Sequence, residues 1–286
     1  MTKAGWRKYG SIFWVEDDFS AAPNHKTETR ERFYSSGIIR LAIAVLKAQG
    51  VDMSVRGSHN IPANGPALFV MNHTGYFDFV FAGTLAHVRG RRLVRFMAKK
   101  EVFDVPVIGA IMRKMKHIPV DRQAGASSLD AAVTSLQQGN LVGIFPEGTI
   151  SRSFEVKELK SGAVRIAAAA NVPLIPVAIW GSQRLWTKDH PRKLGRNHFP
   201  VWVQAGTPFE LSSDAESDTI RLRATMQKLL EDLRTDYEKE YGPFPGGEYW
   251  RPDSLGGSAP SMKEAELKEQ QERQARAEKK AKKQGK

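Results

Sequence analysis

Between residues 51 and 240, short apolar runs alternate with helix-like segments, and this alternation limits the fold more than any other feature of the chain. The runs expected to form strands are Val51–Arg56, Ala67–Met71, Leu93–Ala98, His117–Val120, Leu141–Phe145, Leu174–Trp180 and Val201–Ala205. The expected helices are Phe79–Val88, Val105–Met115, Ser127–Gln138, Ala163–Ala170 and Ala215–Lys239. Interleaved strands and helices indicate an α/β fold with a central, mostly parallel sheet flanked by helices. In such sheets, ligands bind at loops that leave the carboxyl ends of strands.

An N-terminal segment, residues 1–50, precedes the α/β domain, residues 51–240, and contains a predicted helix over residues 30–49. The helix is expected to stop at Gly50, because glycine readily ends helices. It is too short to span a bilayer, so it either lies in a membrane interface or packs on the core as an ordinary helix. In the first case, residues 39 and 43, which share one helical face, would contact lipid.

A C-terminal arm and tail, residues 241–286, follow the α/β domain. Residues 242–260 are rich in Gly and Pro and are interpreted as a linker or extended arm. Residues 261–286 are rich in Lys and contain little that could be buried, so they are expected to form a solvated helix or to be disordered.

The composition restricts the function classes. Forty-three Lys and Arg against 31 Asp and Glu give a net charge of +12, which predicts an anionic partner. The absence of cysteine excludes disulfides, a Cys-ligated zinc site and a thiol nucleophile. No apolar run approaches the roughly 18 residues needed to span a bilayer, and the N-terminus lacks the apolar core of a secretory signal. A cytoplasmic protein, soluble or peripherally attached to the inner face of the cell membrane, is therefore expected.

The first candidate for chemistry is the run from Asn72 to Asp78, NHTGYFD, which directly follows an apolar strand. His73 and Asp78 are five residues apart, so they cannot share a face of a continuous helix. They can meet across a turn that starts a helix, and Gly75 would permit that turn. The carboxylate would then hold one imidazole nitrogen and leave the other free to accept a proton. A purely structural His–Asp pair is the alternative.

A second run places Glu147 in the sequence FPEGT, again directly after an apolar strand. It could be a plain turn, but a glutamate after a buried strand must point into a cleft or find partners. Basic residues flank these loops and could bind an anionic ligand. They are Lys99, Lys100, Lys116, Arg122, Arg152 and Lys160.

Together these runs resemble the PlsC-like 1-acylglycerol-3-phosphate (lysophosphatidate) acyltransferase family. Four family blocks occur in order: NHTGYFD, HIPVDR, FPEGT and VPLIPVAI. The resemblance covers about residues 51–210. It implies an acyltransferase that moves a fatty acyl chain from acyl-CoA or acyl carrier protein to a lysophospholipid acceptor in phospholipid synthesis, with no resident cofactor and no metal.

The resemblance also implies roles for individual residues. His73 would be the general base and Asp78 its orienting partner, while Arg122 would bind the phosphate of the acceptor. The sequence Glu147-Gly148-Thr149 would shape the acceptor pocket, followed by a basic position at Lys160. The family usually has Arg after Glu-Gly-Thr, whereas this chain has Ile150. Either Arg152 supplies that charge or the acceptor differs from lysophosphatidate. Lys99, from the basic set, is a further candidate contact to the anionic substrate.

Four other functions remain as alternatives. The same transfer could use glycerol 3-phosphate or another lysophospholipid as acceptor. A metal-dependent hydrolase would need three or more convergent ligands, and the sequence has no H-x-x-x-H or D-x-D pattern. A nucleic-acid-binding or catalytically idle membrane-binding protein would suit the basic charge. However, the aromatic residues are not interleaved with the basic ones, and the intact His73–Asp78 pair argues against an idle protein. The expected partners are therefore the acyl donor, the lysophospholipid and an anionic membrane surface, and not nucleic acid.

Overall fold

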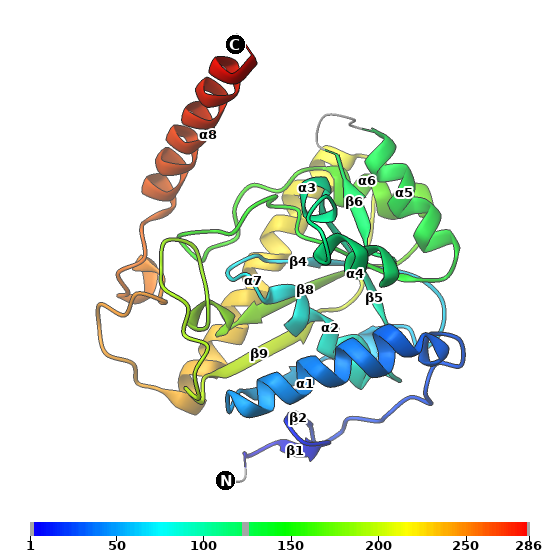
Figure 1. The fold of residues 1–286 in the computed structure, drawn as a ribbon. Helices are drawn as coiled ribbons and strands as arrows, with labels where there is room; N and C mark the ends of the chain where they lie inside the picture. Colours follow the sequence, from blue (N-terminus) through cyan, green and yellow to red (C-terminus); the bar gives the residue numbers. More distant parts are fainter. Residues whose placement is uncertain (1–2, 122–125, 285–286) are drawn as a thin grey trace.

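The structure is a computed structural model that describes residues 3–121 and 126–284 of the 286-residue chain. Within this described part, nine strands form one sheet in the order β1-β2-β3-β9-β8-β4-β7-β5-β6 (Figure 1). The strands are β1 (Trp6–Tyr9), β2 (Phe13–Glu16), β3 (Asp52–Arg56), β4 (Ala67–Met71), β5 (Val94–Lys99), β6 (Ile118–Val120), β7 (Leu141–Ile144), β8 (Leu174–Trp180) and β9 (Pro200–Ala205). Only the β1–β2 and β8–β9 pairs are antiparallel. The predicted α/β fold with a mostly parallel sheet is confirmed.

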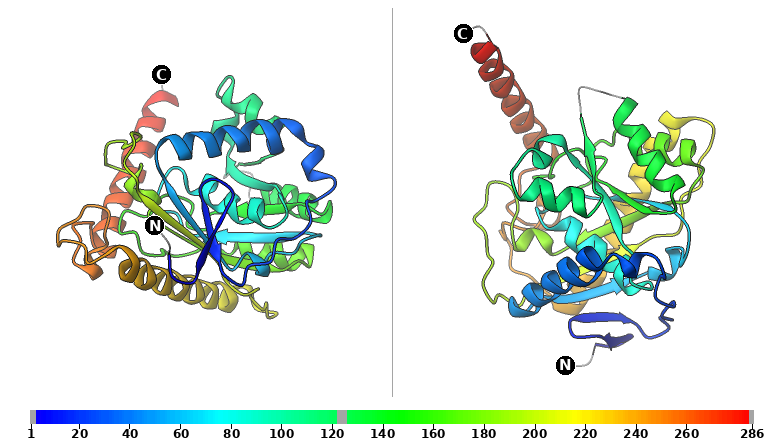
Figure 2. Two further views of the ribbon diagram at one scale, coloured as in Figure 1. Left: turned by 90° about the horizontal axis from the view of Figure 1, so that it is seen from below. Right: turned by 45° about the vertical axis from the view of Figure 1, so that its right-hand side comes forward.

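Helices cover both faces of the sheet, as the view from below shows, with α1 and α7 on opposite sides (Figure 2, left). They are α1 (Ile39–Ala48), α2 (Asp78–Val88), α3 (Lys100–Phe103), α4 (Ile108–Lys114), α5 (Ala126–Gln137), α6 (Gly162–Ala170), α7 (Ala215–Tyr241) and α8 (Met262–Gln284). A π-helical turn, Phe33–Ile38, leads into α1, and single 3₁₀ turns occur at Glu28–Arg30, Ser58–Asn60, Ser182–Arg184 and Asp253–Leu255.

Strand β4 shows how the sheet builds two cores. All five of its side chains are buried, as expected for a central parallel strand. Phe69 and Met71 contribute to the core under α2, whereas Leu68 and Val70 contribute to the core under α5, α6 and α7. This alternation follows from the two-residue period of strand side chains. The continuous apolar sequence ALFVM therefore specifies a strand with helices on both sides.

Two strands near the N-terminus were not predicted. Strands β1 and β2 form an antiparallel hairpin, and β2 pairs with β3 at the edge of the sheet. Aromatic side chains of this hairpin pack on the protein. Phe13 and Trp14 are buried, and the ring of Trp6 lies 5.0 Å from that of Trp202.

Helix α1 has apolar residues on two faces. Ile39 and Ile43 face the protein, where they line a pocket against α2, so the expectation that they would be the lipid-contacting pair is wrong. The outward side carries Leu41 and Val45, which are 61% and 47% exposed. Within the described residues, no helix is both long enough and apolar enough to cross a membrane.

The C-terminal arm packs against the body of the protein. Trp250 is buried, and its ring contacts those of Trp180, Tyr237 and Phe244. Helix α8 follows, and it begins with a capping box in which the Ser261 N–H donates to Glu264 Oε2 at 2.9 Å. The tail is therefore helical through Gln284, and its first turns contact the protein rather than solvent alone.

Candidate active site

Three neighbouring strands end at one edge of the sheet and supply the loops of the candidate site. Strand β4 lies between β7 and β8 and is parallel to both. His73 follows β4, Glu147 follows β7 and Ser182 follows β8. Because the carboxyl ends of parallel strands meet at one edge, residues far apart in the sequence come together there.

The structure brings His73 and Asp78 together in this edge. Nδ1 of His73 lies 3.0 Å from Asp78 Oδ2, and the Asp78 side chain is completely buried. The imidazole is one-fifth exposed and stacks on Phe145, with ring centroids 4.2 Å apart. Since an ionised Asp only accepts hydrogen bonds, Nδ1 carries the proton and Nε2 is the nitrogen able to accept one. The pair therefore has the arrangement of a general base and its orienting acid.

The turn between the two residues is held by the Asp78 carboxylate. The N–H groups of Thr74 and Gly75 donate to Asp78 Oδ2 at 2.6 and 2.8 Å. Asp78 is the first residue of α2, where a negative charge is favourable beside the N-terminus of the helix. At position 75, a Cβ would lie 3.1 Å from the Trp186 carbonyl oxygen and 3.2 Å from that of Ser182, so glycine fits this crowded turn.

Sequence reasoning did not single out Ser182, which is fully buried beside this pair. Its hydroxyl donates to Asp78 Oδ1 at 2.5 Å and lies 3.2 Å from Thr74 Oγ1. Thr187 Oγ1 in turn donates to the Thr74 carbonyl at 2.7 Å. Both oxygens of the Asp78 carboxylate are therefore fixed. The one sequence signal for Ser182 is its position just after the end of a predicted strand.

Glu147 braces the loop that holds His73. Its Oε1 accepts the backbone N–H of His73 at 2.8 Å, and its Oε2 accepts that of Lys157 at 3.3 Å. Burial raises the pKa of Glu147 to about 8, although the two N–H donors and the Lys157 ammonium act in the opposite direction. The Ser151 N–H donates to the His73 carbonyl at 2.7 Å, so the loop after Glu147 also wraps around His73. Glu147 therefore holds in place the backbone that carries the His73 side chain.

Three basic side chains lie close together beside the loop that follows β7. We call Arg152, Lys157 and Lys188 the cation cluster. Lys188 Nζ donates to Thr149 Oγ1 at 2.7 Å, which links the cluster to the Glu-Gly-Thr sequence. Burial, followed by the charge of Arg152, lowers the pKa of Lys188 from its ordinary value. Arg152 is 5% exposed and its Nε donates to Asp189 at 2.6 Å. Neither Lys157 nor Lys188 was among the residues predicted from the sequence.

The other predicted site residues lie as follows. Lys99 is at the carboxyl end of β5, half-exposed, and pairs with Glu101 at 2.8 Å. Lys160 is exposed, and its N–H donates to the Pro146 carbonyl at 3.2 Å. Gly148 adopts a φ of +72° in the turn after β7. Ile150, at the position where the family usually has Arg, is 3% exposed and packs inward. Arg122 lies outside the described residues.

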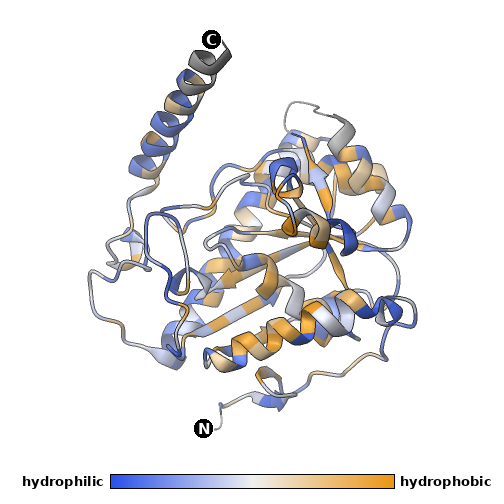
Figure 3. Cartoon of the chain, viewed as in Figure 1, coloured by the Kyte–Doolittle hydropathy of each residue, from blue (hydrophilic) through white to orange (hydrophobic). Residues whose placement is uncertain are grey.

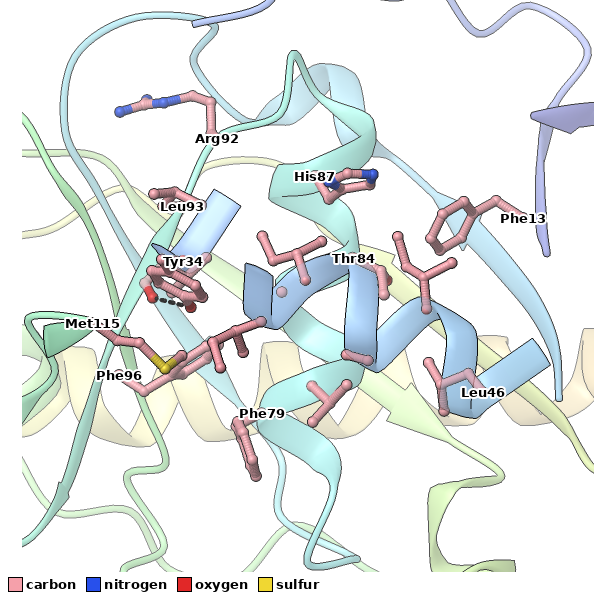
Figure 4. A pocket seen from close by; sticks show the side chains of 17 residues that line it. Phe13, Tyr34, Leu46, Phe79, Thr84, His87, Arg92, Leu93, Phe96 and Met115 are labelled. Atoms are coloured by element: carbon pink, nitrogen blue, oxygen red, sulfur yellow. Dashed lines mark hydrogen bonds between the residues drawn. The ribbon is translucent and has the colours of Figure 1, made fainter. Parts of the chain in front are cut away.

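An apolar pocket lies between α1 and the helix that begins at Asp78 (Figure 4). From α2 it is lined by Phe79, Gly83 and His87, and from α1 by Ile39, Ile43 and other apolar side chains. Tyr34 also contributes, but its hydroxyl donates to the Val94 carbonyl at 2.9 Å, so its polar atom is satisfied. Burial lowers the pKa of His87 to about 4, so this side chain is neutral near pH 7. The lining is therefore suited to hydrocarbon.

Comparison with known proteins agrees with this geometry. A family model for acyltransferases matches residues 52–180, which include His73, Asp78 and Glu147. A 1-acyl-sn-glycerol-3-phosphate acyltransferase of Bacillus subtilis is 35% identical over 143 residues, which are 49% of this chain and 68% of that protein. The chain belongs to the PlsC-like acyltransferase family. The resemblance noted in the sequence is thus confirmed, and the protein is an acyltransferase.

Two further relatives extend the alignment beyond the matched motifs. Human 1-acyl-sn-glycerol-3-phosphate acyltransferase alpha is 27% identical over 227 residues, covering 77% of this chain and 76% of that protein. The crystal structure of the 1-acyl-sn-glycerophosphate acyltransferase PlsC from Thermotoga maritima superposes with a TM-score of 0.58. At 22% identity, with 73% of this acyltransferase and 84% of PlsC covered, that likeness shows a shared fold.

Proposed function

We propose that the protein transfers a fatty acyl chain from an acyl thioester, acyl-CoA or acyl carrier protein, to the free hydroxyl of 1-acylglycerol 3-phosphate, giving phosphatidate. The observation that carries the proposal is the 3.0 Å contact between His73 Nδ1 and the buried Asp78 carboxylate at the end of β4. The named activity of the Bacillus and human relatives supports the choice of acceptor.

The proposed reaction is a direct transfer. The acceptor hydroxyl gives its proton to His73 Nε2 while its oxygen forms a bond to the carbonyl carbon of the thioester. The carbon–sulfur bond then breaks, and the imidazolium returns the proton to the departing thiolate. Asp78 keeps Nδ1 protonated and stabilises the imidazolium, so Nε2 stays directed at the acceptor. The products are the new ester and the free thiol.

The acceptor's phosphate is assigned to the basic side chains near the Glu-Gly-Thr loop. Arg122 and Arg152 were predicted for this role, and the cation cluster adds Lys157 and Lys188. Arg can bind a phosphate with two parallel hydrogen bonds, and Lys contributes a point charge. Lys188 contacts that loop directly through Thr149.

The acyl chain is assigned to the apolar pocket between α1 and α2. Helix α2 begins at Asp78 and lines the pocket with Phe79 and Gly83, so one helix contributes both to the reacting pair and to the pocket. Burying a methylene group contributes about 0.8 kcal/mol, which would favour a long chain over a short one in such a pocket.

Attachment to an anionic membrane surface is part of the proposal. Exposed apolar side chains lie on the outer face of α1, at Leu41 and Val45, and around the start of α4, at Val107 and Ile108. Figure 3 shows α1 as a mostly hydrophobic helix on one side of the molecule. Apolar contact and the net charge of +12 would act together, because each basic residue near an anionic surface adds about 1 kcal/mol.

The test is an acyl-transfer assay with purified protein, labelled acyl-CoA or acyl carrier protein, and a panel of acceptors. The panel contains lysophosphatidate, glycerol 3-phosphate and a zwitterionic lysophospholipid, and His73→Ala is the control for enzyme-dependent transfer. We expect lysophosphatidate to give the highest kcat/KM. A higher value for another acceptor would overturn the acceptor assignment, and equal transfer by His73→Ala would overturn the mechanism.

A further inference from the structure

Helix α8 presents a stripe of side chains to the candidate site. Met262, Ala265, Glu269 and Glu272 recur at helical spacing on one face, and Ala265 and Glu269 are buried. The Ser153 hydroxyl lies 3.2 Å from Met262 Sδ. The tail therefore docks on the loop that follows Glu147-Gly148-Thr149.

The two carboxylates of this stripe pair with the cation cluster. Glu269 Oε1 lies 2.8 Å from Lys157 Nζ, and both side chains are over nine-tenths buried. Glu272 accepts a hydrogen bond from the guanidinium of Arg152. Lys268 also reaches the cluster, through a 2.8 Å contact with Asp189. Burying such an ion pair removes both charges from water. The free energy of this desolvation cancels much of the free energy gained from their attraction.

The cation cluster has an excess of positive charge when α8 is left out. Arg152, Lys157 and Lys188 then face the carboxylate of Asp189 and, through Lys157, the buried carboxyl group of Glu147. In addition, Nη1 of Arg152 is buried and has no hydrogen-bond partner among the described residues. Nη1 of Arg152 therefore retains hydrogen-bond donors for a further acceptor. A phosphate monoester near pH 7.5 carries close to two negative charges and several acceptor oxygens.

We propose that the cation cluster is a binding site for a phosphate monoester and that Glu269 and Glu272 of α8 occupy it until the phosphate displaces them. The carboxylates thus stand in for phosphate oxygens on Lys157 and Arg152. This inference rests on the proposed function, because the phosphate it names is that of the acceptor. It adds Lys157 and Lys188 as binding residues and makes α8 a self-inhibitory element of the same site.

The first test measures binding in the full-length chain, without acyl donor. Calorimetric titration with glycerol 3-phosphate and with inorganic phosphate compares the unmodified protein with the double variant E269Q/E272Q. We expect the double variant to bind about tenfold more tightly or better, because two competing charge-assisted contacts are lost. The matched control is E266Q/E278Q, which removes the same charge from exposed positions of α8 and should leave affinity unchanged. Adding K188Q to E269Q/E272Q should reverse the gain.

The two titrants distinguish the sources of the phosphate. Tighter binding of both assigns the site to the phosphate group itself, and tighter binding of glycerol 3-phosphate alone assigns it to a glycerolipid headgroup. If neither is bound more tightly, or if binding weakens, α8 only stabilises the loop and the proposal is wrong. Because no acyl transfer is measured, a wrong acceptor assignment would leave this result intact and appear only in the transfer assay.

A second test uses the unmodified chain and needs no substitution. Amide hydrogen exchange of residues 262–275 is measured with and without saturating glycerol 3-phosphate, and with glycerol as the neutral control. Displacement of the carboxylates should speed exchange in this segment several-fold in the presence of glycerol 3-phosphate only. Unchanged protection under saturating ligand would overturn the displacement.

Discussion

The Ser182 hydroxyl donates to Asp78 Oδ1 at 2.5 Å across a sequence separation of 104 residues. Asp78 Oδ2 is occupied by His73 and by two backbone N–H groups, so Ser182 is the side chain that fixes the second oxygen. The Ser182 hydroxyl contacts Asp78 Oδ1 and Thr74 Oγ1. It acts on His73 through the orientation of the carboxylate.

We predict that Ser182→Ala lowers kcat by about 10- to 100-fold and leaves KM nearly unchanged. A hydrogen bond to a charged group contributes about 1.5–3 kcal/mol, and a factor of ten in rate corresponds to about 1.4 kcal/mol. Steady-state kinetics measure this, with Ser54→Ala, another fully buried serine with a hydrogen bond, as the control. If both variants lose the same small amount of activity, the role of Ser182 is structural only.

His73→Ala should reduce turnover at least about 100-fold, because the group that accepts the acceptor's proton is removed. The fold should be retained, because Ser182 and two backbone N–H groups still hold the Asp78 carboxylate, and circular dichroism checks this. Asp78→Asn should also be severe, because an amide cannot stabilise the imidazolium. His59→Ala, at an exposed position, is the control, and near-normal turnover by purified His73→Ala would refute the role of base.

Buried His87 and His117, whose pKa values are lowered to about 4, contribute stability that increases as the pH rises toward about 6.5, whereas Glu147 should contribute a decrease in stability from about pH 5 to 8. Its pKa is about 8 in the folded protein against an ordinary value of 4.5, so folding favours the protonated form. That contribution is complete below the ordinary pKa and is lost as the pH rises through 8, with a slope of at most about 1.4 kcal/mol per pH unit. Glu147→Gln should remove this decrease, so its melting temperature should rise with pH relative to that of the unmodified protein, whereas exposed Glu266→Gln should follow the unmodified protein. If melting temperature depends on pH in the same way in all three proteins, the assigned contribution of Glu147 is wrong.

Replacing Leu41 and Val45 with Glu should weaken binding to anionic vesicles, because both side chains are exposed on α1. The control Ala44→Glu/Ala48→Glu makes the same charge change at exposed alanines of this helix and should weaken binding less. Raising salt from about 0.1 to 1 M shortens the Debye length from about 10 to 3 Å and should release much of the protein. Vesicle flotation measures both effects. Flotation of both double variants equal to that of the unmodified protein at all salt concentrations would exclude α1 as the contact.

Gly83→Leu should shorten the preferred acyl chain. Gly83 lines the apolar pocket, and a Cβ there would meet Phe96 at an ordinary 3.9 Å, so the larger side chain extends into the pocket. Competition between short- and long-chain acyl donors measures the preference. Gly195→Leu, in an exposed loop, is the control, and an unchanged preference in Gly83→Leu would show that the chain binds elsewhere.

Much of the sheet could be predicted because its central strands are continuous apolar runs. The predicted bounds of Ala67–Met71 and Leu174–Trp180 are those of β4 and β8. The hairpin before β3 could not be predicted, because Trp6–Tyr9 is only partly buried and lacks an alternating pattern. The strands of the hairpin form because β2 pairs with β3, at the edge of a sheet whose other strands come from distant parts of the chain. Such tertiary pairing overrides weak local preference.

The candidate site was predictable where chemistry and position coincide in one short run. His73, Asp78 and Glu147 each stand within or beside a recognisable motif that ends a strand. Ser182 and Lys188 reach the site from the loop after β8, and neither residue type is unusual there. The contacts of α8 were also beyond sequence reasoning, because Glu269 and Glu272 look like ordinary members of a charged helix. Only their partners, Lys157 and Arg152, distinguish them.

The position of β4 between β7 and β8 has a consequence for how activity returns after denaturation. The contacts of His73 with Glu147 and of Asp78 with Ser182 close chain separations of 74 and 104 residues. Contacts that distant form slowly, whereas helices such as α2 and α7 can form from local interactions alone. During refolding, recovery of helical circular dichroism should therefore precede recovery of turnover. Regained activity reports that the three central strands have paired in the correct register.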